Sequence, residues 1–167
     1  ASGGSYVIRF QDTGFWLAKY AARKGYHKPT GTIALNYCNN LRIFRYAETL
    51  LAYAELVGVE GVAEQKGISA QQCLDMVRDR AFGDTNHRVA VNKQNIINEN
   101  HYEFVGEGHR YYDVVRWGIT EVLNVGNVPG INSARTWKSH NKYVAIPQGD
   151  IDATKGTEFE LKQNEGY

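Results

Sequence analysis

Apolar residues recur at helical spacing over residues 41–57 of the chain. Residues three or four apart lie on the same face of a helix. Phe44 and Leu51 widen the apolar face that five such positions form here. The five positions are Ile43, Ala47, Leu50, Ala54 and Val57. Gly58 follows directly, and glycine favours the end of a helix. The pattern predicts an amphipathic helix of about four turns.

Three more helices are expected downstream. Ser69-Ala70-Gln71-Gln72 has the spacing of a capping box, so a second helix should start at Ser69 and run to about Phe82. A third is expected over about 93–105 and a fourth over about 110–117, with glycines between them. The first two, joined by a glycine-containing loop, should pack as an antiparallel helical pair.

The two ends of the chain lack this periodicity. Residues 1–40 hold short apolar and aromatic runs, which predict one or two strands and irregular loop. Residues 143–146 resemble a strand that ends at Pro147, and the tail after them is polar and irregular. The expected fold is therefore mainly α, with an irregular segment over 1–40 and a single helical domain over 41–167.

Composition narrows the possible functions. The chain has 167 residues, enough for one domain with a real core, and its 22% of charged residues is ordinary for a globular protein. A net charge of +1 provides no footprint for nucleic acid, so no nucleic-acid partner is expected. No apolar run approaches the roughly 20 residues that span a bilayer. The 11 tyrosines, 6 phenylalanines and 3 tryptophans are a rich supply of ring faces for a core or a ligand surface.

Metal, cofactor and nucleophile motifs are missing from the sequence. The five histidines show no zinc-ligand spacing, so neither a metal nor a cofactor is expected. There is no G-x-S-x-G turn to present a nucleophile. Cys38 and Cys73 fix no disulfide framework, and Cys73, at the apolar edge of a predicted helix, is expected to be a small buried side chain.

Charged residues repeat every three or four positions from Glu103 to Arg116. Such spacing predicts a ladder of ion pairs along one helix face. Its members are Glu103, Glu107, Arg110, Asp113 and Arg116. Glu103 and Glu107 also suggest the acid–base pair of a glycosidase. The nearby arginines favour ionisation of both carboxylates, whereas a general acid needs a raised pKa, so the structural ladder is the favoured hypothesis.

The segment from Ile97 to Gly118 resembles the signature of the SusD/RagB family, which reads I-x-x-E-R and then E-L-x-F-E-G-x-R-x-x-D-L-x-R-W-G. Further similar motifs follow the family's order, at 14–20 with Lys19-Tyr20, and at 41–56, 76–81, 143–151 and 163–167. Two positions depart from the pattern. Asn100 replaces an arginine, which removes a charge partner, and Glu165 replaces a proline, which leaves the last turn less rigid.

The resemblance implies a fold of tetratricopeptide-like helical pairs with irregular loops and a few short strands, and no catalytic activity. Family members are longer surface-exposed outer-membrane lipoproteins of Bacteroidetes that bind oligosaccharides or other nutrients. They cap a SusC-like TonB-dependent transporter. This chain, which opens on Ala1 rather than Met, would then be a C-terminal portion. Its partner would be the remaining N-terminal part, which would carry the lipid-bearing cysteine.

Aromatic side chains in predicted loops are the candidates for sugar stacking. They are Trp16, Tyr37 and Trp137. In the family, the main ligand-contacting loops lie upstream of the matching region, so this part would contact ligand little. An alternative from another class is a helical-repeat scaffold that binds a protein or peptide and lacks a sugar platform.

Overall fold

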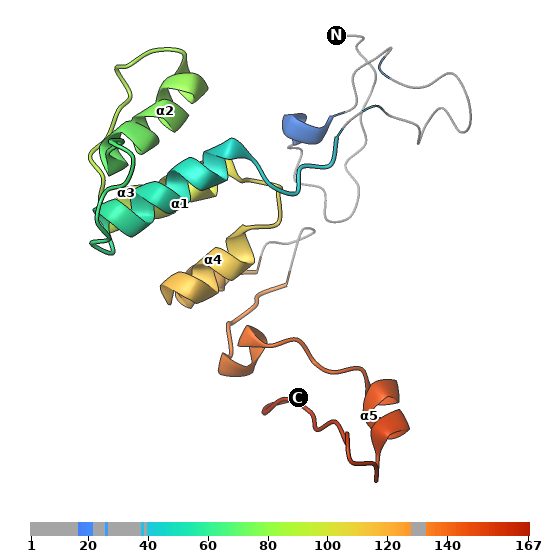
Figure 1. Ribbon diagram of the computed structural model, residues 1–167. Coiled ribbons are helices and arrows are strands. Elements are labelled where there is room, and N and C mark those ends of the chain that lie inside the picture. Colours follow the sequence, from blue (N-terminus) through green and yellow to red (C-terminus); the bar gives the residue numbers. More distant parts are fainter. Residues whose placement is uncertain (1–16, 22–25, 27–37, 39, 128–132) are drawn as a thin grey trace, which may run out of the picture. The chain divides into compact units, whose positions relative to one another are not determined.

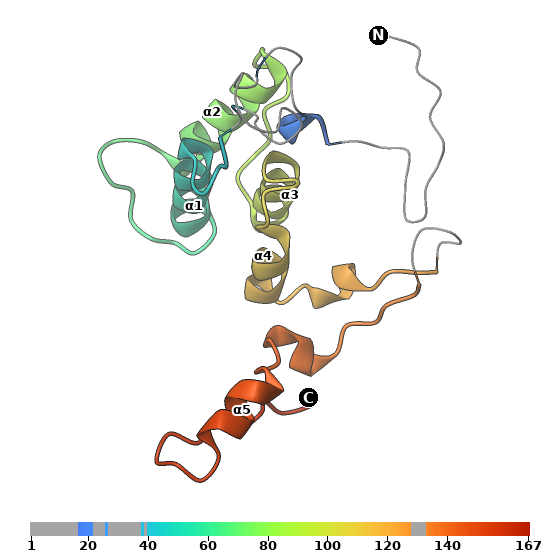
Figure 2. The same cartoon turned by 90° about the vertical axis from the view of Figure 1, so that its right-hand side faces the viewer.

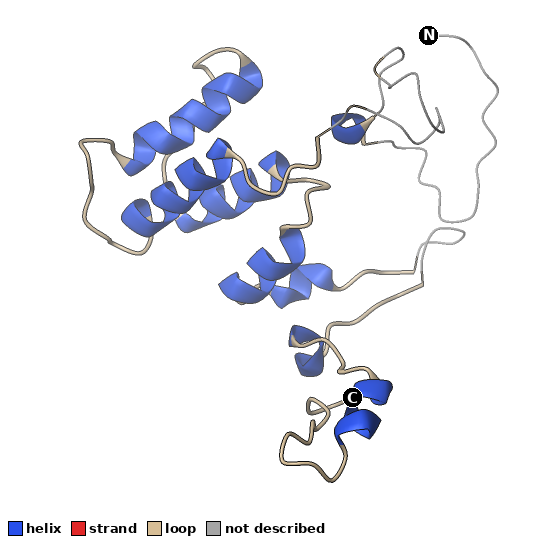
Figure 3. Cartoon of the chain, turned by 45° about the vertical axis from the view of Figure 1, so that its right-hand side comes forward, coloured by secondary structure: helices blue, strands red, loops and turns tan. Residues whose placement is uncertain are grey.

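The computed structural model describes residues 17–21, 26, 38, 40–127 and 133–167 (Figure 1). These residues are mainly helical, as predicted (Figure 3). Within them the β-structure is the isolated antiparallel bridge between Val125 and Arg135. The chain divides into two compact units, one over 16–111 and one made of 1–15 with 112–167, and each is described by itself. The predicted domain boundary at residue 40 stays a prediction.

The first unit is built on three α-helices and a short 3-10 helix. The bounds of these elements are η1 Ala18–Tyr20, α1 Tyr46–Gly58, α2 Ala70–Phe82 and α3 Lys93–Glu103. Helices α1 and α2 lie side by side and run in opposite directions (Figures 1 and 3), and α3 packs along α1 (Figure 2). The expected antiparallel helical pair is confirmed.

Helix α2 begins and ends as its sequence predicts. The Ser69 hydroxyl accepts a hydrogen bond from the Gln72 backbone N–H at 3.1 Å, and the Gln72 side chain accepts one from the Ser69 N–H at 2.8 Å. At the other end Gly83 has φ +76°, a left-handed conformation that suits glycine, and its N–H donates to the Asp79 carbonyl. Local capping thus fixes both ends of the helix.

Helix α1 begins five residues later than predicted. Arg45, the residue before it, has extended backbone (φ −135°, ψ 154°), and Ile43 and Phe44 are exposed rather than facing the core. The predicted helical turn over 41–45 was therefore wrong. The apolar spacing is present there, but Arg45 turns away to bind carboxylates on another part of the chain.

The core of this unit lies between α1, α2 and α3. Its buried members are Leu50, Leu51, Ala54, Ala70, Cys73, Leu74, Val77, Ile96 and Phe104. At the end of α1, a Cβ on Gly58 would lie 2.3 Å from Val91 Cγ1, so the absence of a side chain lets the two segments approach closely. Cys73 is buried as expected, and burial raises the pKa of its thiol.

Helix α4, Arg110–Trp117, has the bounds that the sequence predicts. Its first two residues belong to the first unit and the others belong to the second. The second unit continues with η2 Thr120–Leu123, η3 Ser139–Lys142 and α5 Gln148–Thr154. Helix α5 was not predicted from the sequence, because it is only seven residues long and contains Gly149. Among the described residues, no helix combines the length and the apolar character that crossing a membrane requires.

The predicted strand over 143–146 is wrong, because side chains take the place of a partner strand. The Gln163 side chain bonds both backbone groups of Ile146, each at 2.9 Å. Asn164 Nδ2 donates to the Val144 carbonyl at 2.8 Å, and the Tyr167 hydroxyl donates to the Tyr143 carbonyl at 2.7 Å. The last five residues therefore hold this extended segment in place.

Candidate functional site

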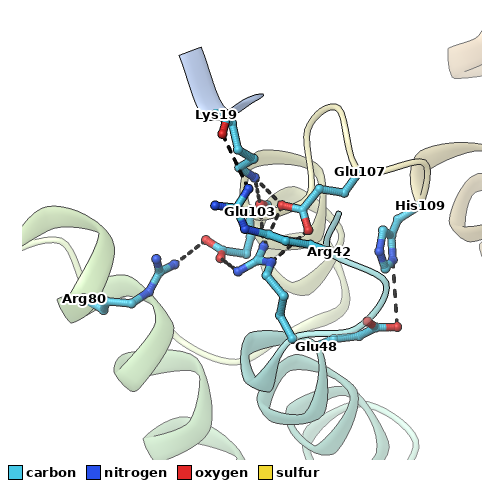
Figure 4. Close-up of polar contacts among 8 residues, drawn as sticks. Lys19, Arg42, Glu48, Arg80, Glu103, Glu107 and His109 are labelled. Carbon is cyan, nitrogen blue, oxygen red and sulfur yellow. Dashed lines mark hydrogen bonds and ion pairs between the residues drawn. The ribbon is translucent and has the colours of Figure 1, made fainter. Parts of the chain in front are cut away.

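The carboxylates of Glu103 and Glu107 lie together at the end of α3. Glu103 is the last residue of that helix, and Glu107 lies in the loop between α3 and α4. Their side chains are only 9% and 1% exposed. Figure 4 shows Lys19 and Arg80 reaching these carboxylates from two different elements of the fold. We call Lys19, Arg45, Arg80, Glu103 and Glu107 the ionic cluster.

Arg45 is the centre of the ionic cluster. Its Nε and Nη2 donate to the two oxygens of Glu107 at 2.8 and 2.9 Å, which is the paired geometry that a guanidinium favours. Its Nη1 donates to Glu103 Oε1 at 2.7 Å, and the guanidinium lies 5.0 Å from the centre of the Phe104 ring. One side chain thus ties the start of α1 to the end of α3.

Two other segments join the same carboxylates. Lys19, in η1, donates to Glu107 Oε1 and to the Glu103 carbonyl, each at 2.5 Å. Arg80, in α2, donates to Glu103 Oε2 at 2.6 Å. The ionic cluster therefore joins η1, α1, α2 and α3, and each carboxylate has cationic partners on both of its oxygens.

The surroundings of Glu107 and Arg45 favour the charged form of each. Burial alone would raise the pKa of Glu107, but the hydrogen bonds from Arg45 and Lys19 outweigh it, and the pKa lies below its usual range. Burial likewise lowers the pKa of Arg45, and the bonds to Glu107 and Glu103 reverse that effect and raise it. A general acid must still carry its proton at neutral pH, which requires a raised pKa. Glu107, whose pKa is lowered, is therefore unsuited to that role.

The predicted ladder is corrected by this arrangement. Helix α3 stops at Glu103, so Glu103 and Glu107 do not share a helix face with the residues of α4, and their partners come from other elements. Asp113 and Arg116 do pair, at 3.3 Å. Arg110 Nη1 is buried and has no hydrogen-bond partner among the described residues.

The lowered pKa of Glu107 predicts how the stability of the protein changes in acid. A group whose pKa is depressed by folding stabilises the fold above its unfolded pKa, about 4.3 for glutamate, and that stabilisation is lost as the pH falls through the folded value. We therefore expect the urea midpoint of the intact protein to fall between about pH 5 and pH 3. The urea midpoint of Glu107→Gln, measured by circular dichroism, should fall less over the same pH interval. Equal losses in both proteins would contradict the assignment.

The sugar-stacking candidates remain predictions. Trp16 and Tyr37 lie outside the described residues. Trp137 is half-buried in the second unit, and its backbone N–H donates to the Asn124 side chain at 2.6 Å, next to the bridge between Val125 and Arg135. This position fixes the backbone of Trp137 and does not test a role for its ring.

The described part of the chain contains neither a cluster of metal-ligating side chains nor a disulfide. No group of three histidine, cysteine, aspartate or glutamate side chains gathers there as a metal ion would need. Cys38 is exposed and Cys73 is buried, and both are free.

Sequence reasoning missed Lys19, Arg45 and Arg80 as partners of the carboxylates. Arg45 lies 58 residues from Glu103, and Lys19 lies 88 from Glu107, so no local spacing connects them. The available signal was the family motifs, since all three cations lie inside segments that resemble them.

Comparisons with known proteins agree with one another. The model of the SusD family matches residues 5–167. Surface glycan-binding protein A from Bacteroides fluxus is 55% identical (TM-score 0.86; 99% of this chain, 35% of that one). Surface glycan-binding protein A from Bacteroides thetaiotaomicron, in complex with laminarihexaose, is 43% identical (TM-score 0.80; 98% and 33%). A laminarin-binding SusD-like protein is 33% identical (TM-score 0.73; 98% and 31%). The chain spans about a third of the length of each.

Proposed function

The chain belongs to the SusD family, and we propose that the intact protein binds glycan at the cell surface without transforming it. The observation that carries the proposal is the relative in complex with laminarihexaose, 43% identical over 98% of this chain. A second relative is named for laminarin binding. The proposed ligand class is therefore a β-1,3-glucan of the laminarin type.

The proposed setting follows from the family as a whole. The protein would stand on the outer membrane, held by a lipid on an upstream cysteine, and would pass its ligand to a SusC-like TonB-dependent transporter. The N-terminal part of the same protein would supply the main ligand loops. Within this scheme the present chain contributes the rigid support rather than most of the ligand contacts.

The ionic cluster supports a non-catalytic role. A retaining or inverting glycosidase needs one carboxyl group that holds its proton and a second that reaches the sugar. Glu103 and Glu107 instead have their oxygens bound by Arg45, Lys19 and Arg80, and the pKa of Glu107 is lowered. The cluster is suited to joining segments of the fold.

One observation favours the alternative function of peptide binding. A largely apolar hollow of about 530 Å³ lies along α1 and the loop before α2. Tyr46, Leu50, Tyr53 and Ile68 are among its lining residues. A hollow of this kind fits an amphipathic helix.

Calorimetric titration of the intact protein separates the two functions. We expect saturable heat with laminarihexaose and little heat with maltohexaose, a hexasaccharide of the same glucose units in α-1,4 linkage. The reason is that a site shaped to one linkage places its ring faces and polar groups for that linkage only. Failure to bind any glycan, together with tight binding of an amphipathic peptide, would favour the scaffold and overturn the proposal.

A further inference from the structure

A small hollow lies beside η1. Its volume is about 220 Å³. The described residues that line it are Ala18, Lys19, Tyr20, Ala21, Tyr26, Asn40 and Arg42. The lining thus includes two tyrosines, an asparagine and an arginine, which are among the residue types that sugar sites use for ring contact and hydrogen bonding.

The wall made by η1 is held firmly. Lys19 is bonded to Glu107 and to the Glu103 carbonyl, as described above. Just before η1, Leu17 lies against Gly106, where an added Cβ would come within 2.2 Å of Leu17 Cδ2. Gly106 also has φ +77°, so two features of this position favour glycine. The ionic cluster therefore fixes this side of the hollow before any ligand arrives, which reduces the ordering cost of binding.

Backbone and side-chain contacts position the opposite wall. The Cys38 N–H donates to the Tyr26 carbonyl at 3.2 Å, which holds Tyr26 close to the segment that leads to Asn40. The Arg42 guanidinium lies 5.3 Å from the centre of the Tyr20 ring and donates to the Lys19 carbonyl at 3.5 Å. Arg42 thus covers one face of Tyr20, while Tyr26 is 63% exposed and presents its ring for contact.

These groups match a neutral sugar. The C–H face of a pyranose packs on an aromatic ring such as Tyr26, while the Asn40 amide and the Arg42 guanidinium donate to ring hydroxyls. Lys19 is already paired with Glu107, so Arg42 is the cation of the lining whose donors can serve a ligand, and a guanidinium donates to neutral hydroxyls. We propose that this hollow is a subsite for one sugar unit of a neutral glycan, additional to the main ligand site. The subsite rests on the glycan binding proposed above.

Tyr26→Ala in the intact protein tests the subsite directly. Loss of one stacking ring should weaken the affinity for laminarin about two- to twelvefold, because such contacts contribute about 0.5–1.5 kcal/mol and 1.4 kcal/mol is tenfold. Tyr26→Phe keeps the ring and should bind within about twofold of the wild type. Tyr102→Ala is the matched control, since Tyr102 is similarly exposed but is not among the residues lining the hollow, and it should bind as the wild type does.

Arg42→Gln gives a second, independent test, because this exposed side chain can be changed without disturbing the core. It should also weaken laminarin binding, with unchanged hydrogen exchange over α1–α3. Wild-type affinity in both Tyr26→Ala and Arg42→Gln would overturn the subsite and leave the proposed function standing. Absence of glycan binding by the wild type would overturn both, so the two failures are distinguishable.

Discussion

Arg45→Met should lower the stability of the α1–α3 unit by about 3 kcal/mol, near the low end of what breaking a buried ion pair costs. Methionine keeps much of the length of the side chain but leaves Glu107, 1% exposed, without its paired donors. The estimate is at the low end because Arg45 itself is 20% exposed and partly hydrated. Hydrogen exchange of the α3 amides in the intact protein measures the effect, since protection there reports local opening.

Arg42→Met is the matched control. Arg42 lies three residues earlier in the same segment, is exposed, and has no bond to either carboxylate among the contacts of the described residues. Its replacement should change stability by less than about 0.5 kcal/mol. Equal loss of α3 protection in Arg42→Met and Arg45→Met would show that the cluster is not what joins α1 to α3.

Leu74→Ala should cost about 3–4 kcal/mol, within the range for truncating a buried leucine. Leu74 in α2 is fully buried in the core that α1 and α3 complete, so the lost side chain leaves a cavity. The expected results are a lower urea midpoint and faster hydrogen exchange across α1 and α2. Because Leu74 lies in the core and not in the 220 Å³ hollow, glycan affinity should be retained below the melting temperature.

Met76→Ala supplies the comparison for Leu74→Ala. Met76 is in the same helix and has a side chain of similar size, but it is 44% exposed. We expect a loss below about 1 kcal/mol, because little apolar surface leaves the interior. A loss as large as that of Leu74→Ala would mean that Met76 is covered by another part of the intact protein.

Local signals predicted the helices well where capping decides their ends. The Ser69–Gln72 capping box gave the start of α2, and glycine spacing gave the bounds of α4. Local signals predicted the wrong structure where a contact with a distant residue determines the backbone conformation. The apolar spacing before Tyr46 favoured helix, but Arg45 is extended and binds carboxylates about 60 residues away. Likewise, residues 143–146 have a strand-like composition, yet the side chains of Gln163 and Asn164 satisfy their backbone.

The same limit applied to the candidate site. Charge spacing favoured Glu103 and Glu107 as ion-pair residues over an acid–base pair, and in the structure both carboxylates lie within ion-pair distance of cationic side chains. Charge spacing could not identify the partners of these carboxylates, because Lys19, Arg45 and Arg80 lie in or next to three other elements. Family motifs contain all three cations, but a motif shows only that a residue recurs, and the fold was needed to show what it contacts.

The intact protein is proposed to bind a β-1,3-glucan and to leave it unchanged. The most direct measurement is to incubate the protein with laminarihexaose at a concentration that saturates the calorimetric signal, and then to analyse the sugar by chromatography. We expect the bound hexasaccharide to be recovered intact. Release of shorter oligosaccharides by the wild type, abolished in Glu103→Gln while binding persists, would contradict it and identify this carboxylate as a catalytic group.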